Sequence, residues 1–216
     1  MKTLLPFFFL LLFSAATAFS QQSALFTGLG KPLKNQKSGS TLGSPYLNDE
    51  FEKANVITSS GNSLKDLPLR YDILNNHIEY ATENNIYDIT DSVNAFTLKA
   101  SENHTGKFIK LKNTDSKISG FLELVYNGNI SLYKLNSIKV ISEENFYTKN
   151  ITKKYVPSNI YYIASGDKFT KIGSSKKDYL NAFKSNVKVR AFLNSTDVNF
   201  NSDNSLTPLA KLIDNQ

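Results

Sequence analysis

The chain has 216 residues, with 25 Lys and Arg against 19 Asp and Glu, a formal net charge of +6 and no cysteine. The absence of cysteine excludes disulfides, thiol nucleophiles and thiolate metal sites. It also excludes a bacterial lipoprotein anchor, which needs a cysteine at the cleavage point. Once a leader is removed, the length suffices for one domain or two small ones.

Residues 1–20 are typical of a secretory signal peptide. Lys2 supplies the positive start, Leu4–Phe13 is the apolar run, and small residues then allow cleavage after Ala18 or Ser20. The apolar run is well short of the roughly 20 residues that span a bilayer. No later stretch is apolar enough to do so. We therefore expect a periplasmic or extracellular protein with no membrane span after signal cleavage.

Composition divides the rest of the chain into three parts. Residues 21–44 hold many Gly, Ser, Lys and Gln, which predicts a flexible lead-in. Residues 45–172 are predicted to form a β-rich domain, and residues 173–216 a short helical C-terminal region. The β-rich part opens with an acid-rich segment that we expect three side chains to anchor to the core: Tyr46, Leu47 and Phe51.

The β-rich part is expected to be organised around a hairpin at residues 67–82. Two Asn residues at 75–76 suit a tight turn because Asn tolerates a positive φ. A two-residue turn there places Tyr71 opposite Tyr80, an aromatic cross-strand pair of the kind that stabilises adjacent strands.

The strongest hairpin signal in the sequence is Asn127-Gly128, which follows an apolar run at 121–126. A strand at 130–135 is expected to return from this turn. Further short strands are expected at 54–58, 86–89, 93–98, 108–111 and 138–141.

A third hairpin is expected to turn at Ser165-Gly166. Its strands are 160–163 and 169–172, and the register places Tyr162 opposite Phe169.

After this hairpin the apolar period changes from two to about three and a half. Ser175 and Asp178 resemble a capping box at a helix start. The first helical face is expected to hold Tyr179, Leu180, Phe183 and Val187, and a second short helix Val189, Phe192 and Leu193.

Thr207 before Pro208 predicts the start of a last helix, because proline fits the first helical position. Strands followed by two or three short helices predict an α+β fold built mostly of antiparallel hairpins. Whether the strands form a sheet, a sandwich or a barrel-like arrangement stays open.

Several short motifs recur in the order found here in a known group of proteins. They are Gly43–Phe51, Leu67–Asp72, Ile78–Tyr80, Tyr161–Ile163 and Lys176–Leu180 with Phe183. This layout resembles a family of uncharacterised exported proteins of Bacteroidetes. The resemblance implies an envelope or secreted location, and it implies no activity and no catalytic residues.

Residues that could bind a metal are few. His77 lies beside a predicted turn and His104 in a polar loop, and neither has the neighbouring ligands that a metal site needs. The segment 197–203 has the alternating oxygens of a calcium loop. Its sixth position is Ser202 rather than Gly, and its twelfth is Pro208 rather than Glu. We expect no metal and no cofactor.

Catalytic patterns are equally weak. The chain has no Gly-x-Ser-x-Gly motif, no phosphate-binding loop and no dinucleotide fingerprint. Asp88 with Asp91, and Glu143 with Glu144, are acids close in sequence, whereas acid/base hydrolysis needs two carboxylates across a cleft. We expect a protein that is not an enzyme.

Aromatic side chains are the remaining candidates for binding. Tyr71, Tyr80, Tyr161 and Tyr162 lie on predicted strands and, if exposed, would stack on a sugar or a peptide. Packing in the core is the alternative. The neighbours Tyr161 and Tyr162 point to opposite faces of a strand, so we expect one of them to be less buried.

Charge is unevenly distributed along the chain. Residues 45–98 carry nine acids and three bases, and residues 99–190 carry seventeen bases and seven acids. The basic part either binds an anionic partner or lies beside the acidic part and complements it. An exported protein rarely meets nucleic acid, so none is expected.

The sequence therefore favours an exported, non-enzymatic interaction or structural component of the bacterial cell envelope, bound to an unknown protein or glycan. The alternative is a module that binds a glycan or anionic polymer through exposed Tyr and Lys. A carboxylate-dependent hydrolase is the third hypothesis.

Overall fold

The computed structural model describes residues 30–33, 41–101, 104–111, 118, 120–166, 168–173 and 175–215. The predicted signal peptide at 1–20 and most of the predicted lead-in at 21–44 lie outside the described residues. Within the part that is described, no helix has the length and apolar character needed to cross a membrane.

Eleven strands form one large sheet in which every neighbouring pair is antiparallel. The order across this sheet is β1 (Lys31–Pro32), β6 (Ile86–Asp88), β5 (His77–Ala81), β4 (Ser63–Asp72), β3 (Glu52–Thr58), β7 (Val93–Ser101), β8 (His104–Lys110), β9 (Phe121–Asn127), β10 (Ser131–Leu135), β13 (Ile160–Ser165) and β14 (Lys168–Ile172). Strands β1 and β14 are its two edges, so the sheet is open.

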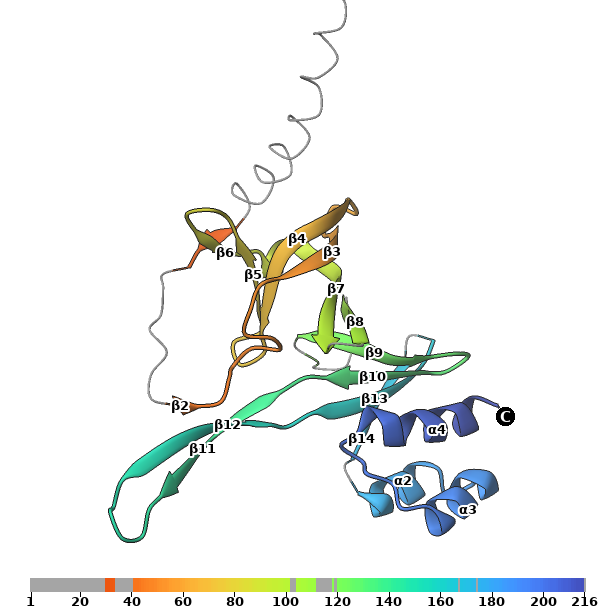
Figure 1. Cartoon of the computed structure of the whole chain (residues 1–216). Coiled ribbons are helices and arrows are strands. Elements are labelled where there is room, and N and C mark those ends of the chain that lie inside the picture. Colours follow the sequence, from red (N-terminus) through yellow and green to blue (C-terminus); the bar gives the residue numbers. More distant parts are fainter. Residues whose placement is uncertain are drawn as a thin grey trace, which may run out of the picture.

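A smaller sheet and three helices complete the fold, which is α+β as predicted (Figure 1). The small sheet has the order β11 (Ile138–Glu144), β12 (Ile151–Pro157) and β2 (Thr41–Leu42). The helices are α2 (Lys176–Ala182), α3 (Val187–Ser195) and α4 (Asp203–Asp214), and a 3-10 turn, η1 (Thr90–Ser92), precedes β7.

The hairpin of β4 and β5 is present, but its predicted register is wrong by two residues. Tyr71 pairs with Ile78 rather than with Tyr80. Four residues, 73–76, connect the strands, and Asn76 adopts the expected positive φ of 57°. The Tyr71 hydroxyl donates a hydrogen bond to Asn76 Oδ1 at 2.9 Å, which fixes this wider turn. Because side chains alternate with a period of two, the shift leaves each one on its predicted face.

The other two predicted hairpins also exist. Gly128 lies in the turn between β9 and β10 as predicted, whereas Asn127 is the last residue of β9 and β10 begins at Ser131 rather than at residue 130. In the hairpin of β13 and β14, Tyr162 pairs with Lys171 rather than with Phe169, again a shift of two residues. Here the turn begins at Gly166, whose φ of 57° suits glycine.

The helix starts were predicted with mixed success. Ser175 caps α2 and accepts a hydrogen bond from the backbone N–H of Asp178, as predicted. The predicted start of α4 at Thr207 is wrong, because the helix begins at Asp203 and Pro208 lies inside it. The Thr207 hydroxyl donates to the Asp203 carbonyl at 2.8 Å in the same turn.

The first predicted helix, which was expected to extend to Val187, is too long. Helix α2 ends at Ala182, and Val187 instead begins α3, where it is 79% exposed. Asn186 starts α3 by accepting a hydrogen bond from the backbone N–H of Val189 at 2.9 Å. An Asn in a non-helical conformation is a favoured N-cap, and it separates the two helices.

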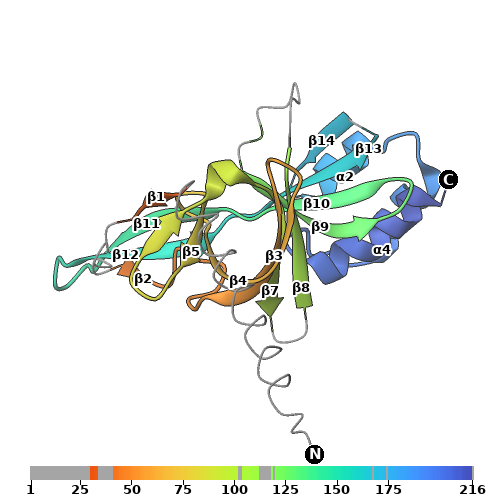
Figure 2. The same cartoon turned by 90° about the horizontal axis from the view of Figure 1, so that it is seen from above.

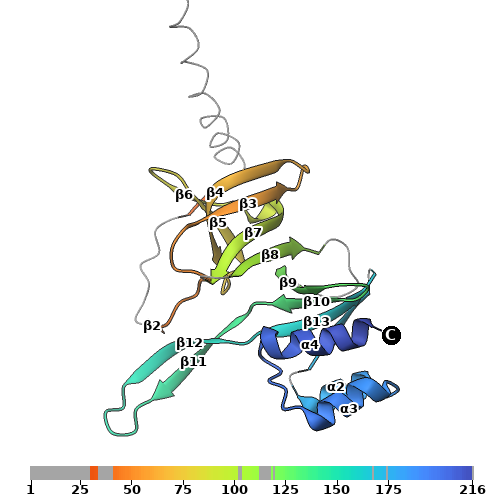
Figure 3. The ribbon, with the colours of Figure 1, turned by 45° about the vertical axis from the view of Figure 1, so that its right-hand side comes forward.

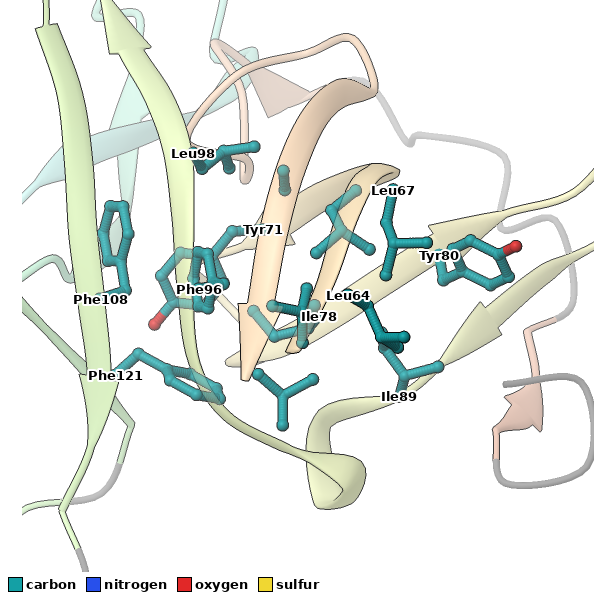
Figure 4. Packing of buried hydrophobic residues seen from close by; sticks show 14 residues of the cluster. Leu64, Leu67, Tyr71, Ile78, Tyr80, Ile89, Phe96, Leu98, Phe108 and Phe121 are labelled. Atoms are coloured by element: carbon teal, nitrogen blue, oxygen red, sulfur yellow. The ribbon is translucent and has the colours of Figure 1, made fainter. Parts of the chain in front are cut away.

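Two groups of buried side chains hold the fold together. The first lies among strands β3 to β9, where the rings of Phe96 and Phe108 stack with centroids 4.6 Å apart and Tyr71 meets both edge-on (Figure 4). The second joins β10, β13 and β14 to the three helices. Its fully buried members include Leu132, Tyr179, Val189, Leu193, Leu206 and Leu209.

One long hairpin links the two sheets. Strands β10 and β11 pair with β13 and β12 in a single register that runs from Ser131 opposite Ala164 to Glu144 opposite Ile151. The inner half lies within the large sheet between β9 and β14. The outer half, residues 138–157, projects away from it (Figures 1 and 3), and we name it the hairpin arm.

Candidate functional site

The four tyrosines considered as ligand-binding residues all lie in the interior. Tyr71 is 1% exposed, Tyr80 4%, Tyr161 3% and Tyr162 8%. A stacking platform needs an exposed ring face, which none of these side chains offers in this structure. Tyr161 and Tyr162 are both buried, and the expected difference in burial between them is small. Their position agrees with the core-packing alternative.

A buried polar cluster surrounds Lys134 on β10. Its ammonium group lies 2.9 Å from Glu123 Oε2 and 2.6 Å from Asp203 Oδ2. Tyr161 donates to the other oxygen of Asp203 at 2.7 Å, and Asn136 donates to Glu123 at 2.8 Å. These contacts link strands β9, β10 and β13 to the first turn of α4.

The electrostatics of this cluster suit a structural role. Burial by itself lowers the pKa of Lys134, but the charge of Glu123 and hydrogen bonds to Asp203 and Glu123 outweigh it and raise that pKa. Burial, followed by the hydrogen bond to Asp203, raises the pKa of the Tyr161 hydroxyl. A nucleophilic or basic lysine needs a lowered pKa. The cluster therefore keeps its protons and fastens α4 to the sheet.

The acids considered as catalytic pairs each lie beside a different basic side chain. Asp91 contacts Lys31 at 3.3 Å on the surface. Asp88 Oδ2 lies 3.8 Å from His77 Nε2. Glu143 and Glu144 lie on the hairpin arm, where each forms a salt bridge with a lysine of that arm. The structure does not bring the two pairs together.

The metal candidates are also dispersed. Asn199 Oδ1 accepts the backbone N–H of Asn201, and Asp203 is held by Lys134 and Tyr161. Within the described ranges, no three His, Cys, Asp or Glu side chains converge as a metal site would require. The backbone of His104 is described as the first residue of β8, but its side chain is not.

The hairpin arm carries the largest exposed apolar side chains that the structure describes. Phe146 is 78% exposed and Tyr147 is 91% exposed, and both lie in the turn between β11 and β12. Other exposed apolar residues along the arm are Val140, Ile141, Ile151 and Val156, and Leu42 of β2 lies beside it. Exposed apolar groups in this number make the projecting arm a candidate interaction surface.

Local hydrogen bonds give the turn its shape. Asn145 accepts the backbone N–H groups of Tyr147 and Thr148, both at 2.9 Å, and Lys149 has a φ of 59°. The rings of Phe146 and Tyr147 meet edge-on with centroids 5.6 Å apart, and the Lys149 ammonium lies 5.1 Å from the Phe146 ring centre. The two rings are thus presented together at the tip.

The two faces of the arm differ in chemistry. Cross-strand pairing places Val140 beside Tyr155, and the same face carries Ile138 and Ile151. The opposite face carries three charged residues, Lys139, Glu143 and Lys154, together with the apolar Ile141 and Val156. The first face is therefore the more apolar of the two.

The sequence interpretation missed most of this element. A strand was expected at 138–141, but neither its partner β12 nor the turn between them was predicted. The signal was present: β-branched residues occur at 151, 152 and 156, and the turn is bounded by Asn145 and Asn150.

Figure 2 shows the arm and the helices at opposite ends of the molecule. Comparison of the chain with protein-family models, with curated proteins and with solved structures gave no match. The resemblance to exported proteins of Bacteroidetes stays a prediction.

Proposed function

We propose that this protein is an exported, non-enzymatic interaction component of the bacterial cell envelope, and that it binds another protein through the tip and apolar face of the hairpin arm. The observation that carries the proposal is the exposure of Phe146 and Tyr147 at the end of a projecting hairpin. Aromatic residues are enriched at protein interfaces, and Tyr is among the residues that most often contribute a large share of the binding energy. The predicted signal peptide supports export.

The large sheet and the three helices, which we call the body, support a scaffold role in this proposal. Its titratable clusters form ion pairs and hydrogen bonds that join elements of the fold, as Lys134 and Asp203 do. Side chains such as Leu132, Tyr179 and Leu209 pack together where the helices meet the sheet and leave no room there for a water molecule. The body therefore serves to hold the arm in place.

The test is crosslinking in the native cells, followed by purification through a C-terminal tag and mass spectrometry. The wild-type protein is compared with a variant that combines Phe146→Ser and Tyr147→Ser. Val187→Ser is the matched control, because Val187 is also apolar and 79% exposed but lies on α3. We expect one dominant partner protein with the wild type and the control, and at least a tenfold loss with the tip variant.

Other results would contradict the proposal. Equal recovery of the partner with the tip variant would mean that the arm does not bind it. Recovery of the protein alone would exclude a stable protein partner. Purified partner and purified protein should then reproduce the same loss in a direct binding measurement.

Glycan binding is a second candidate, and one observation favours it. Tyr147 is 91% exposed, and the Lys149 side chain in the same turn is 69% exposed although it contacts Glu144, so an aromatic face and a cation lie together on the surface as a site for an acidic sugar requires. Co-purification with polysaccharide that is lost in the tip variant would support this function in place of a protein partner.

A further inference from the structure

The outer edge of β11 is a second feature of the hairpin arm. Among the residues that the structure describes, β11 pairs with β12 alone in the small sheet, and it forms an edge of that sheet. Six of its seven residues, 139–144, are exposed. An uncovered strand edge presents backbone N–H and C=O groups that can pair with another strand.

The alternation of hydrogen bonds along β11 shows which of its residues direct their backbone N–H and C=O groups away from β12. At the two ends of its pairing with β12, Asn145 N–H bonds to the Asn150 carbonyl, and Ser158 N–H bonds to the Ser137 carbonyl. The register between these points has no bulge. Odd-numbered residues of β11 therefore bond to β12, and the even-numbered residues direct their backbone groups to the open edge.

We propose that β11 pairs antiparallel with β11 of a second copy of this chain, about a twofold axis at Ile141, to give a dimer. In this register all seven residues of β11 find a partner. Ile138 lies opposite Glu144 of the partner subunit, and Val140 lies opposite Ser142 of the partner subunit. All four residues in these pairs are even-numbered, so the backbone groups that each copy directs to its open edge can form hydrogen bonds with one another.

Charge complementarity selects the same register. Lys139 lies opposite Glu143 of the partner subunit, and the twofold axis repeats this pair on the other side of Ile141. Both are non-hydrogen-bonded positions, where opposing side chains approach most closely. Lys139 has no ion pair within the described part of its own chain, whereas Glu143 contacts Lys154.

Neighbouring registers are less favourable. A shift of two residues in one direction pushes the turn of the second copy against β9, since Leu122 of β9 pairs with Leu135 just before β11 begins. A shift in the other direction leaves Ile138 and Lys139 opposite turn residues only. A strand of different charge pattern would place unmatched charges at the edge, so the same residues disfavour other partners.

The inference does not rest on the proposed function, because it uses the edge of β11 rather than the aromatic tip. The test uses the purified protein alone. Sedimentation and light scattering should report twice the monomer mass for the wild type, and the tip variant with Phe146→Ser and Tyr147→Ser keeps the charge pairs and should still dimerise. A monomeric wild type at high micromolar concentration would overturn the proposal.

Charge reversal tests the ion pairs. Lys139→Glu and Glu143→Lys, each alone, should weaken dimerisation at least tenfold. The two changes together should restore it, because the pairs reform with exchanged signs. Glu143→Lys also loses the contact with Lys154, but the single and double variants share that loss. Failure of the double variant to recover would contradict the register.

Cysteine crosslinking reads the register directly, since the natural chain has no cysteine. Opposing residues at a non-hydrogen-bonded twofold position are close enough for a disulfide. Ile141→Cys should give a disulfide-linked dimer on mild oxidation. Val140→Cys and Ser142→Cys are controls, each lying on the axis of a neighbouring register. Faster crosslinking of either control than of Ile141→Cys would overturn the proposed register.

Discussion

Replacing Lys134 by methionine tests whether the buried polar cluster fastens α4 to the sheet. Methionine keeps an apolar stem of similar length but removes the ammonium group that lies 2.9 Å from Glu123. The Glu123 side chain is only 2% exposed, so its charge is left in the interior without this cation. Breaking a buried ion pair in this way typically costs about 3–5 kcal/mol.

The structure places the expected loss near the lower end of this range, at about 3 kcal/mol. Asn136 still donates to Glu123 at 2.8 Å, and the Asp203 side chain is 34% exposed and regains contact with water. At a urea slope of about 2 kcal/mol per molar, the unfolding midpoint should fall by about 1.5 M. Far-UV circular dichroism and tyrosine fluorescence can follow the transition, because the chain has no tryptophan.

The matched control adds Glu123→Gln to Lys134→Met. The glutamine oxygen still accepts the bond from Asn136, and the carboxylate charge at this position is removed. The double variant should therefore be at least about 1 kcal/mol more stable than Lys134→Met alone. A loss below about 1 kcal/mol for the single variant, or no recovery in the double variant, would refute the reasoning.

Three further predictions concern the stability of the fold, and each depends on the surroundings of particular side chains. Arg70→Lys should lower the free energy of unfolding in urea by about 1–3 kcal/mol. The guanidinium lies 3.8 Å from the ring centre of Tyr46 and 4.5 Å from that of Phe51, and it donates two hydrogen bonds to Glu79 Oε2. An unchanged unfolding midpoint would contradict this prediction. Gly106→Ala should lower stability by about 1–3 kcal/mol, since a Cβ there would lie 2.6 Å from a buried phenylalanine ring. Burial raises the pKa of Tyr71, Tyr161 and Tyr179. Above pH 10 the unfolded chain loses protons that the folded chain keeps, so stability should fall by about 1.4 kcal/mol per pH unit for each tyrosine; stability that is flat between pH 10 and 12 would exclude this linkage.

Turn chemistry and side-chain alternation are local, and the sequence determined both. Gly128 and Gly166 marked two real turns, and Ser175 marked the start of α2. Tyr71 and Tyr80 also share one face of the β4–β5 hairpin as predicted, since Tyr71 pairs with Ile78 and Leu69 pairs with Tyr80. These features depend on residues within a few positions of one another, so the sequence contains the whole signal.

Registers and helix boundaries depend on more than local preference. The predicted cross-strand partners of Tyr71 and Tyr162 were wrong by two residues. The alternation of side chains along a strand determines only the face on which each lies, whereas the length of the turn determines the register, and packing adjusts that length. The start of α4 moved to Asp203, where contacts with Lys134 and Tyr161 hold the first turn. Those partners lie on other elements, and no pattern within the helix could indicate them.

Only the tertiary structure decided which side chains are available for binding. Tyr161 and Tyr162 point to opposite faces of β13, and both are buried because both faces are covered there. Phe146 and Tyr147 have the same residue types and are exposed, because β11 and β12 extend beyond the neighbours that flank β10 and β13. Exposure depends on where distant strands end, and that is a property of the assembled sheet rather than of any one segment.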